Sequence, residues 1–257
     1  MLDARTGCFA EVRQAWPGLL RVGAYLPAGD GEPGWTGVRV LVIADLLARV
    51  AELSGLQAVT AALFAGEPPA SQTGAERTAA ALGIHPAAAR ASADQARSVL
   101  GGPADARITG PEGGIAGADG PVARVGVVHA DAGPGSTPPA GTPASDPLAI
   151  RLAMLSRPHD QPVDLSDAAL AEAGRTLARW RGRVSAWAES PSGPMPAGAR
   201  AALDAAFSDL DIPRALRVLA DLERDTDAPD GTRFETFAFA DRVLGLDLAS
   251  EIGQSHG

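Results

Sequence analysis

The stretch LLRVGAYL (residues 19–26), with VRVLVIADLLARVAEL (38–53) and AVTAALF (58–64) after it, decides the fold. The first and third runs are short and apolar, as buried strands are. The middle run repeats its apolar residues at three- and four-residue spacing, which predicts a helix that Ser54-Gly55 ends. Because a helical crossover separates the two strands, we expect them to pair in parallel. This order is typical of the first half of a nucleotide-binding α/β fold.

A loop of residues 28–37, rich in glycine and proline, is expected between the first strand and the helix. In α/β folds a ligand is held at this end of the sheet. Gly23 would allow close backbone approach in the strand. Tyr25 is the only tyrosine of the chain and lies at the strand's end, where it could line a binding site.

The rest of the chain changes character near residue 146, from mixed structure to successive helices. Asp146-Pro147 reads as an N-cap followed by a proline in the first turn. The sequence predicts an α/β domain over 1–145 and an all-α helical domain over 146–257. The further expected elements are helices at 76–82 and 86–100, a flexible surface segment at 101–121, a strand at 122–129, and helices at 148–156, 168–189, 197–210, 213–224 and 233–244.

Composition excludes several classes of function. With 46% apolar residues among 257, the chain has the composition of a globular protein. A formal net charge of −9 disfavours electrostatic binding of nucleic acid. The 22 basic residues are all arginine, which excludes lysine-based phosphate binding and Schiff-base chemistry. A single cysteine, Cys8, excludes a cysteine-rich zinc site, and no apolar run is long enough to span a membrane. We therefore expect a cytoplasmic protein.

Several collinear segments carry a family resemblance. DPLAIRLAMLS (146–156), PVDLS (162–166) and DLDIPRAL (209–216) resemble segments of cysteinyl-tRNA synthetases and of the related ligases that join cysteine to glucosaminyl-inositol in mycothiol synthesis. TGVR (36–39), leading into VIADLLAR (42–49), is similar to the family's first ATP motif and its helix. LGIHP (82–86), with Arg90-Ala-Ser92, resembles a later segment of the same half. The resemblance implies a class I synthetase-like Rossmann domain with a helical appendage.

The chain departs from the family's pattern wherever the family's chemistry resides. The first ATP motif has two histidines flanking Ile-Gly, whereas positions 35–38 here read Trp-Thr-Gly-Val. The second motif needs two lysines, whereas the corresponding Gly133-Pro-Gly-Ser-Thr137 has no cation nearby. The family's first zinc ligand would fall where Val22 stands, and the segment between Arg90 and Val122 is too short to carry the other ligands. The departures predict that adenylation has been lost.

Three hypotheses of function remain open. The first is a non-catalytic protein that binds a small ligand or a protein partner, with no catalytic and no metal-binding residue. The second is a repurposed ATP-dependent ligase that activates a small amino acid. For either, the expected binding residues are Gly23, Tyr25, Thr36, Gly37 and Arg151, and ATP is the one cofactor left open.

The third hypothesis is an RNA-binding protein that uses a basic helix face. That face would consist of Arg175, Arg179, Arg181 and Arg183. The alternative for these arginines is a solvated helix surface with neighbouring acidic residues. The acidic net charge favours this alternative.

Overall fold

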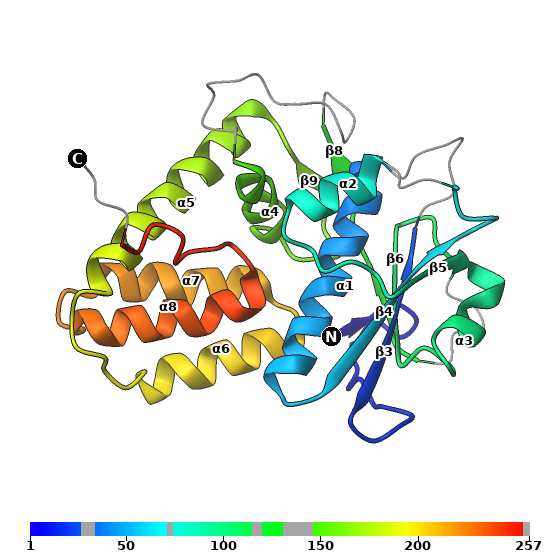
Figure 1. Cartoon of the computed structure of the whole chain (residues 1–257), viewed down its shortest axis with the longest axis horizontal. Coiled ribbons are helices and arrows are strands. Elements are labelled where there is room, and N and C mark those ends of the chain that lie inside the picture. Colours follow the sequence, from blue (N-terminus) through cyan, green and yellow to red (C-terminus); the bar gives the residue numbers. More distant parts are fainter. Residues whose placement is uncertain (27–33, 71–73, 115–119, 131–145, 254–257) are drawn as a thin grey trace. The chain divides into compact units, whose positions relative to one another are not determined.

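The computed structural model describes residues 1–26, 34–70, 74–114, 120–130 and 146–253 (Figure 1). The chain folds into two compact units. The first consists of Met1–Thr137 with His159–Ser166, and the second of Pro138–Pro158 with Asp167–Gly257. The segment 159–166 belongs to the first unit because its strand pairs with a strand of that unit.

The first unit is an α/β structure built on a parallel sheet. In the described residues the sheet has five strands in the order β5-β4-β3-β6-β7, and every neighbouring pair is parallel. Its elements are β1 (Leu2–Asp3), β2 (Cys8–Phe9), β3 (Leu19–Tyr25), α1 (Trp35–Leu53), β4 (Gln57–Phe64), α2 (Gly74–Ala81), β5 (Ala89–Ser92), the 3-10 helix η1 (Ala93–Gln95), α3 (Ala96–Val99), β6 (Ala106–Thr109), β7 (Val122–Arg124), β8 (Val128–His129) and β9 (Val163–Asp164). The predicted strand–helix–strand unit and its parallel pairing are confirmed.

Helices cover the two faces of the sheet in a Rossmann-like way. Helix α1 packs on β3 and β4 and contacts α2, whereas α3 packs on β4 and β5 from the other face (Figure 1). The chain moves outward from β3 to β4 and β5, and then returns past them to β6. Right-handed crossovers in opposite directions place the connecting helices on opposite faces. The strand order therefore reverses between β3 and β6, the place where α/β folds hold ligands.

Four of the sequence predictions for this unit are wrong in detail. The helix begins at Trp35, so the end of the expected loop is helical, and its earlier residues 28–33 lie outside the described residues. The expected helix at 86–100 contains strand β5, because pairing with β4 overrides the helix propensity of its alanines. The expected surface segment at 101–121 contains β6, whose four residues are too few to show a period. The expected strand at 122–129 is two strands, β7 and β8.

Helix α1 is buried on nearly all sides, and one of its buried residues, Arg39, carries a charge. The Arg39 side chain is fully buried and donates hydrogen bonds to the carbonyl oxygens of Gly126, at 3.2 Å, and Gln161. Burial lowers the pKa of Arg39 to about 10, although the charge of Asp160 opposes this shift. At Gly126 an added Cβ would lie 2.2 Å from the Gln161 carbonyl oxygen. Only glycine therefore permits the close approach at which Arg39 reaches both carbonyls.

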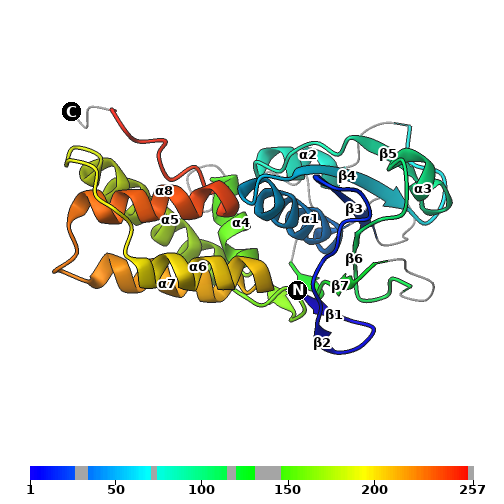
Figure 2. The same ribbon diagram turned by 90° about the horizontal axis from the view of Figure 1, so that it is seen from below.

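The second unit is entirely helical in the residues that the structure describes. The helices α5, α6, α7 and α8 can be followed side by side in Figure 2, with α4 packed on α5. Their bounds are α4 (Pro147–Leu155), α5 (Asp167–Trp187), α6 (Ala197–Asp209), α7 (Ile212–Arg224) and α8 (Asp230–Leu244). The predicted cap of α4 is confirmed, since the Asp146 carboxylate accepts a hydrogen bond from the Leu148 N–H at 2.8 Å.

An aromatic cluster forms the core between α5 and α8. The Phe237 ring makes edge contacts with Trp180 and Trp187, at centroid distances of 5.5 and 5.1 Å. Trp180 is buried, yet its indole N–H donates to the Glu223 carboxylate at 2.9 Å. Such edge-to-face pairs add to the stabilisation that burial provides.

Among the described residues, no helix combines the length with the apolar character that a membrane span requires.

The N-terminal hairpin is tied to the sheet through Asp3, which makes its contribution dependent on pH. The buried Asp3 carboxylate accepts hydrogen bonds from the Arg5 side chain at 2.8 Å and from the Val122 N–H at 3.2 Å. The hydrogen bonds from Arg5 lower the pKa of Asp3 from 3.8 to about 2. Because the folded pKa lies below the unfolded one, this stabilisation is complete above the unfolded pKa and is lost as the pH falls towards about 2.

We expect Asp3→Asn to lower the free energy of unfolding at pH 7 by about 1–3 kcal/mol, because the Val122 and Arg5 donors lose their charged acceptor. It should also flatten the dependence of stability on pH below about 4. Urea unfolding over the acidic to neutral range measures both effects. Glu11→Gln, at an exposed pair with Arg13, is the control and should change neither. A wild-type pH profile in Asp3→Asn would contradict this role.

Candidate functional site

The candidate site lies where β3 and β6 run side by side in the first unit. Tyr25 is paired in register with Thr109, so the carboxyl ends of both strands lie at the same edge of the sheet. After Tyr25 the chain leads towards α1 on one face, whereas β6 is reached from α3 on the other. This reversal of strand order defines the ligand crevice of α/β sheets.

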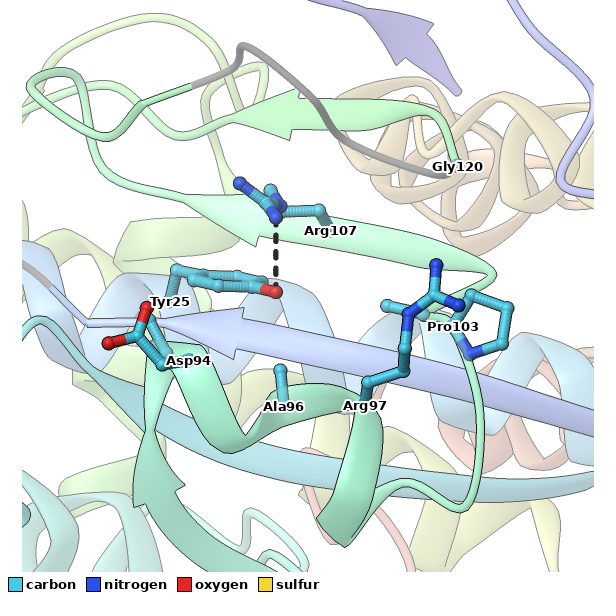
Figure 3. A pocket seen from close by; sticks show the side chains of 9 residues that line it. Tyr25, Asp94, Ala96, Arg97, Pro103, Arg107 and Gly120 are labelled. Atoms are coloured by element: carbon cyan, nitrogen blue, oxygen red, sulfur yellow. Dashed lines mark hydrogen bonds between the residues drawn. The ribbon is translucent and has the colours of Figure 1, made fainter.

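The side chains of Tyr25 and Arg107 form a stacked pair at this place. The Arg107 guanidinium carbon lies 4.0 Å from the centroid of the Tyr25 ring, and its Nη2 donates to the tyrosine hydroxyl at 3.2 Å (Figure 3). Its Nη1 donates to the Gly114 carbonyl oxygen, also at 3.2 Å. A guanidinium over an aromatic face is favoured by the quadrupole of the ring. These contacts fix the orientation of the Arg107 head group.

Gly23 has a packing role that follows from Tyr25. A Cβ added at Gly23 would lie 2.7 Å from Cε2 of the Tyr25 ring and 3.2 Å from a methyl carbon of Leu63. The ring therefore lies over Gly23, two residues back on the same face of the strand. The structure thus brings together two of the residues that the sequence singled out. The reason for the glycine is the room it leaves for the tyrosine ring.

A pocket of about 230 Å³ opens beside the stacked pair, on the α3 face of the sheet. Its walls come from β3, η1, α3, β6 with the segment before it, and the segment before β7. The lining residues are Tyr25, Ala93, Asp94, Ala96, Arg97, Pro103, Ala104, Arg107 and Gly120. The sequence missed Arg97 and Arg107, because it read the first as part of a long helix and the second as part of a surface segment.

The start of α1 holds Thr36 and Gly37, and both have structural contacts. The Thr36 hydroxyl oxygen accepts a hydrogen bond from the Val128 N–H at 3.1 Å, which joins the first turn of α1 to β8. Gly37 is buried in the helix, and Val38 after it is fully buried, at 0% exposure. The first turn of α1 is therefore occupied by contacts within the protein.

Arg151, the fifth expected binding residue, belongs to the second unit. Its side chain is fully buried in α4, and its Nε donates to the carbonyl oxygen of Leu244 at 2.6 Å. Leu244 is the last residue of α8, where helix carbonyls lack partners within the helix. A cation at this end also interacts favourably with the helix dipole. Arg151 therefore satisfies a carbonyl group at the carboxyl end of α8.

The basic face predicted on α5 is largely neutralised by acidic neighbours. Arg175 pairs with Glu172, Arg179 with Glu223, and Arg181 with Asp146. Arg181 also donates to the carbonyl oxygens of two residues that follow α8. Three of the four arginines thus have carboxylate partners, as expected for a solvated helix surface.

Metal ligation finds no support in the described part of the chain. Across the described ranges, no three His, Cys, Asp or Glu side chains lie close enough to hold a metal ion. Val22, at the position of the family's first zinc ligand, is fully buried in β3. Gly133–Thr137, the counterpart of the second ATP motif, lies outside the described residues.

No family model matches the chain. Over 104 residues it is 38% identical to a cysteine–tRNA ligase of Parvibaculum lavamentivorans, a match that covers 38% of this chain and 22% of that protein. Over 111 residues it is 36% identical to an L-cysteine:1D-myo-inositol 2-amino-2-deoxy-alpha-D-glucopyranoside ligase of Nocardiopsis dassonvillei, which covers 40% of this chain and 26% of that protein. The chain spans about a quarter of the length of these curated relatives. The matches support a relationship to the cysteinyl-tRNA synthetase family, as the sequence predicted.

The packing of Tyr25 over Gly23 can be tested by a double-mutant cycle. Gly23→Ala should lower the free energy of unfolding by about 1–3 kcal/mol, since its methyl group would displace the ring. In a Tyr25→Ala background the same change should be neutral or stabilising by about 0.5–1 kcal/mol, because alanine is favoured over glycine within a strand. Urea unfolding of the four proteins gives the coupling energy. Equal costs in both backgrounds would show that the ring does not occupy this space.

Proposed function

We propose that this chain, related to the cysteinyl-tRNA synthetases over about two fifths of its length, does not form an aminoacyl adenylate and acts by binding. In this proposal it is a degenerate member with a class I synthetase-like Rossmann domain over 1–145 and a helical domain over 146–257. The parallel sheet and its strand order support the first part. A small ligand or a protein partner would be what it binds.

The observation that carries the proposal is the burial of Val38. The family resemblance places a catalytic histidine at this position, where the side chain would have to reach ATP. Here the residue is valine, and it is fully buried in α1. Thr36, two residues earlier, uses its hydroxyl to bind the backbone of Val128. In this proposal core packing at Val38 therefore takes the place of an ionisable group in the first turn of the helix.

The two lysines of the family's second ATP motif have no counterpart in the sequence. The chain has no lysine, and residues 131–145 contain no arginine either. Each positioned donor or charge that stabilises a transition state contributes roughly 10²–10³ in rate. Such groups act together, so their losses do not simply multiply. The loss of both histidines and both lysines still leaves too little stabilisation for useful adenylation.

Gly23, Tyr25, Thr36 and Gly37 stay part of the proposal as residues of the binding region in the first unit. Tyr25 has the clearest role, because its ring lines the pocket. The RNA-binding alternative is disfavoured by the net charge of −9 and by the acidic partners of the α5 arginines.

The proposal predicts no amino-acid-dependent exchange of pyrophosphate with ATP. The assay uses the full chain with ATP, magnesium and labelled pyrophosphate, first with cysteine and then with each other amino acid. The cysteine–tRNA ligase of Parvibaculum lavamentivorans serves as the active control in the same buffer. Exchange by this chain should stay at the level of a protein-free sample. Robust exchange with any amino acid would refute the proposal and favour the repurposed ligase.

Binding of ATP separates the two hypotheses further. A working ligase must bind ATP, and a ligand that binds only the folded state raises the melting temperature as its concentration passes Kd. We expect no saturable rise in melting temperature up to millimolar ATP with magnesium. A saturable rise that Thr36→Val leaves unchanged, without exchange, would indicate a nucleotide site retained elsewhere in the protein.

A further inference from the structure

The pocket beside Tyr25 contains a guanidinium, that of Arg107, to which the described residues provide no carboxylate partner. The Arg107 guanidinium is half-buried, and its two hydrogen-bond acceptors, the Tyr25 hydroxyl and the Gly114 carbonyl, are neutral. In the described residues no carboxylate lies within ion-pair distance of it. A guanidinium has five N–H donors, and these two bonds use two of them. Arg107 therefore keeps donors for a further acceptor.

A second guanidinium contributes to the same wall. Arg97 extends from α3 towards the β6 side of the pocket (Figure 3). The one carboxylate among the lining residues is that of Asp94. The lining thus carries two guanidinium groups and one carboxylate. Because the described residues give Arg107 only neutral acceptors, the pocket favours an anionic occupant.

The size of the pocket limits what can bind. Its volume of about 230 Å³ lies below the roughly 300–1,000 Å³ of pockets that enclose drug-sized ligands. The enclosed space is therefore smaller than a whole nucleoside triphosphate would fill. The alanines Ala93, Ala96 and Ala104 leave the space open, and the Tyr25 ring forms part of its wall. A short molecule with one charged end fits these walls.

The charged end of such a ligand would meet a guanidinium that is already oriented. Arg107 is held by its stacking on Tyr25, and Tyr25 is in turn held by its packing over Gly23. A side chain that is fixed before binding loses little conformational entropy when the ligand arrives. The planar guanidinium also matches the geometry of carboxylate and phosphate oxygens.

We propose that the pocket between β3, β6 and α3 binds a small anion that carries a carboxylate or a phosphate group. Arg107 binds the anionic group directly, Arg97 adds charge from the opposite wall, and Tyr25 packs against the body of the ligand. This inference rests on the proposed binding function and names the chemistry of its ligand. Binding of a small anion does not require adenylation, so the pyrophosphate-exchange assay tests a different property of the protein.

Isothermal titration calorimetry at constant ionic strength tests the inference. Inorganic phosphate and lactate are titrated separately into the full chain, with sodium chloride as the matched salt. The two arms decide between the phosphate and the carboxylate class. At least one of them should bind saturably with a Kd on the order of 10 mM or lower, as expected for a charge-assisted contact.

Substitutions in the pocket then localise the binding. Arg107→Gln should weaken it roughly ten- to a hundredfold, the effect of losing a charge-assisted hydrogen bond. Arg97→Gln, at an exposed position, should weaken it less and leave the fold intact. Arg13→Gln is the matched control, since it removes the same charge from a side chain that is 86% exposed and outside the pocket.

Each outcome of this experiment decides the inference. No heat of binding above the chloride control for either anion would overturn it. Equal affinities of Arg107→Gln, Arg97→Gln and Arg13→Gln would also overturn it, since binding would then follow net charge alone. If Arg107→Gln unfolds, the affinities of Arg97→Gln and Tyr25→Phe are compared with that of Arg13→Gln instead. Tyr25→Phe removes only the hydroxyl beside Arg107. None of these results bears on whether the chain exchanges pyrophosphate.

Discussion

A single buried guanidinium, that of Arg39, joins helix α1 to two segments that lie far from it in the sequence. It donates to the carbonyl oxygens of Gly126 and Gln161, and burial lowers its pKa to about 10. Taking a cation out of water is costly unless hydrogen bonds replace its hydration. The contact therefore requires the two carbonyl groups to lie close together. Gly126 permits this because it has no side chain. Strands β8 and β9 pair directly beyond this contact.

This contact explains why the start of α1 is so thoroughly buried. The helix packs on the sheet through one side and on the β8 segment through another. The Thr36 hydroxyl takes part in this second contact, where it accepts a hydrogen bond from the Val128 N–H, and the Val38 side chain lies in the core. In an adenylating relative the same turn would have to present histidines to ATP. In this chain the same turn contributes a buried valine and a hydrogen bond to the backbone of Val128.

The opposite face of the sheet, which α3 covers, contains the candidate pocket. There the Tyr25 ring, the Arg107 guanidinium and the small side chains of η1 and α3 enclose a pocket. The arrangement depends on Gly23, which the sequence marks only as a point of close approach. A binding function for this protein is thus better supported on the α3 face than at the position that matches the ATP motif.

Local signals predicted a substantial part of this structure. The bounds of most helices were predicted within a few residues. The signals were the apolar period of 38–53, the caps at Asp146-Pro147 and Ser54-Gly55, and the breakers between the C-terminal helices. These signals succeed because caps and amphipathic faces act over one or two turns. Strands β5 and β6 escaped prediction for the complementary reason. They have four residues each, and their strand conformation depends on hydrogen bonds to neighbours far along the chain.

The sequence by itself determined the α/β class of the first unit, the relationship to the cysteinyl-tRNA synthetase family and the absence of lysine. Composition and motif positions suffice for these, because they depend on which residues are present. The tertiary structure alone decided which residues meet. The Arg151 side chain donates to the last carbonyl of α8, whereas Arg107, expected on a flexible surface segment, stacks on Tyr25. An isolated arginine looks the same in either case, and only the groups that the fold brings within about 4 Å of it determine its role.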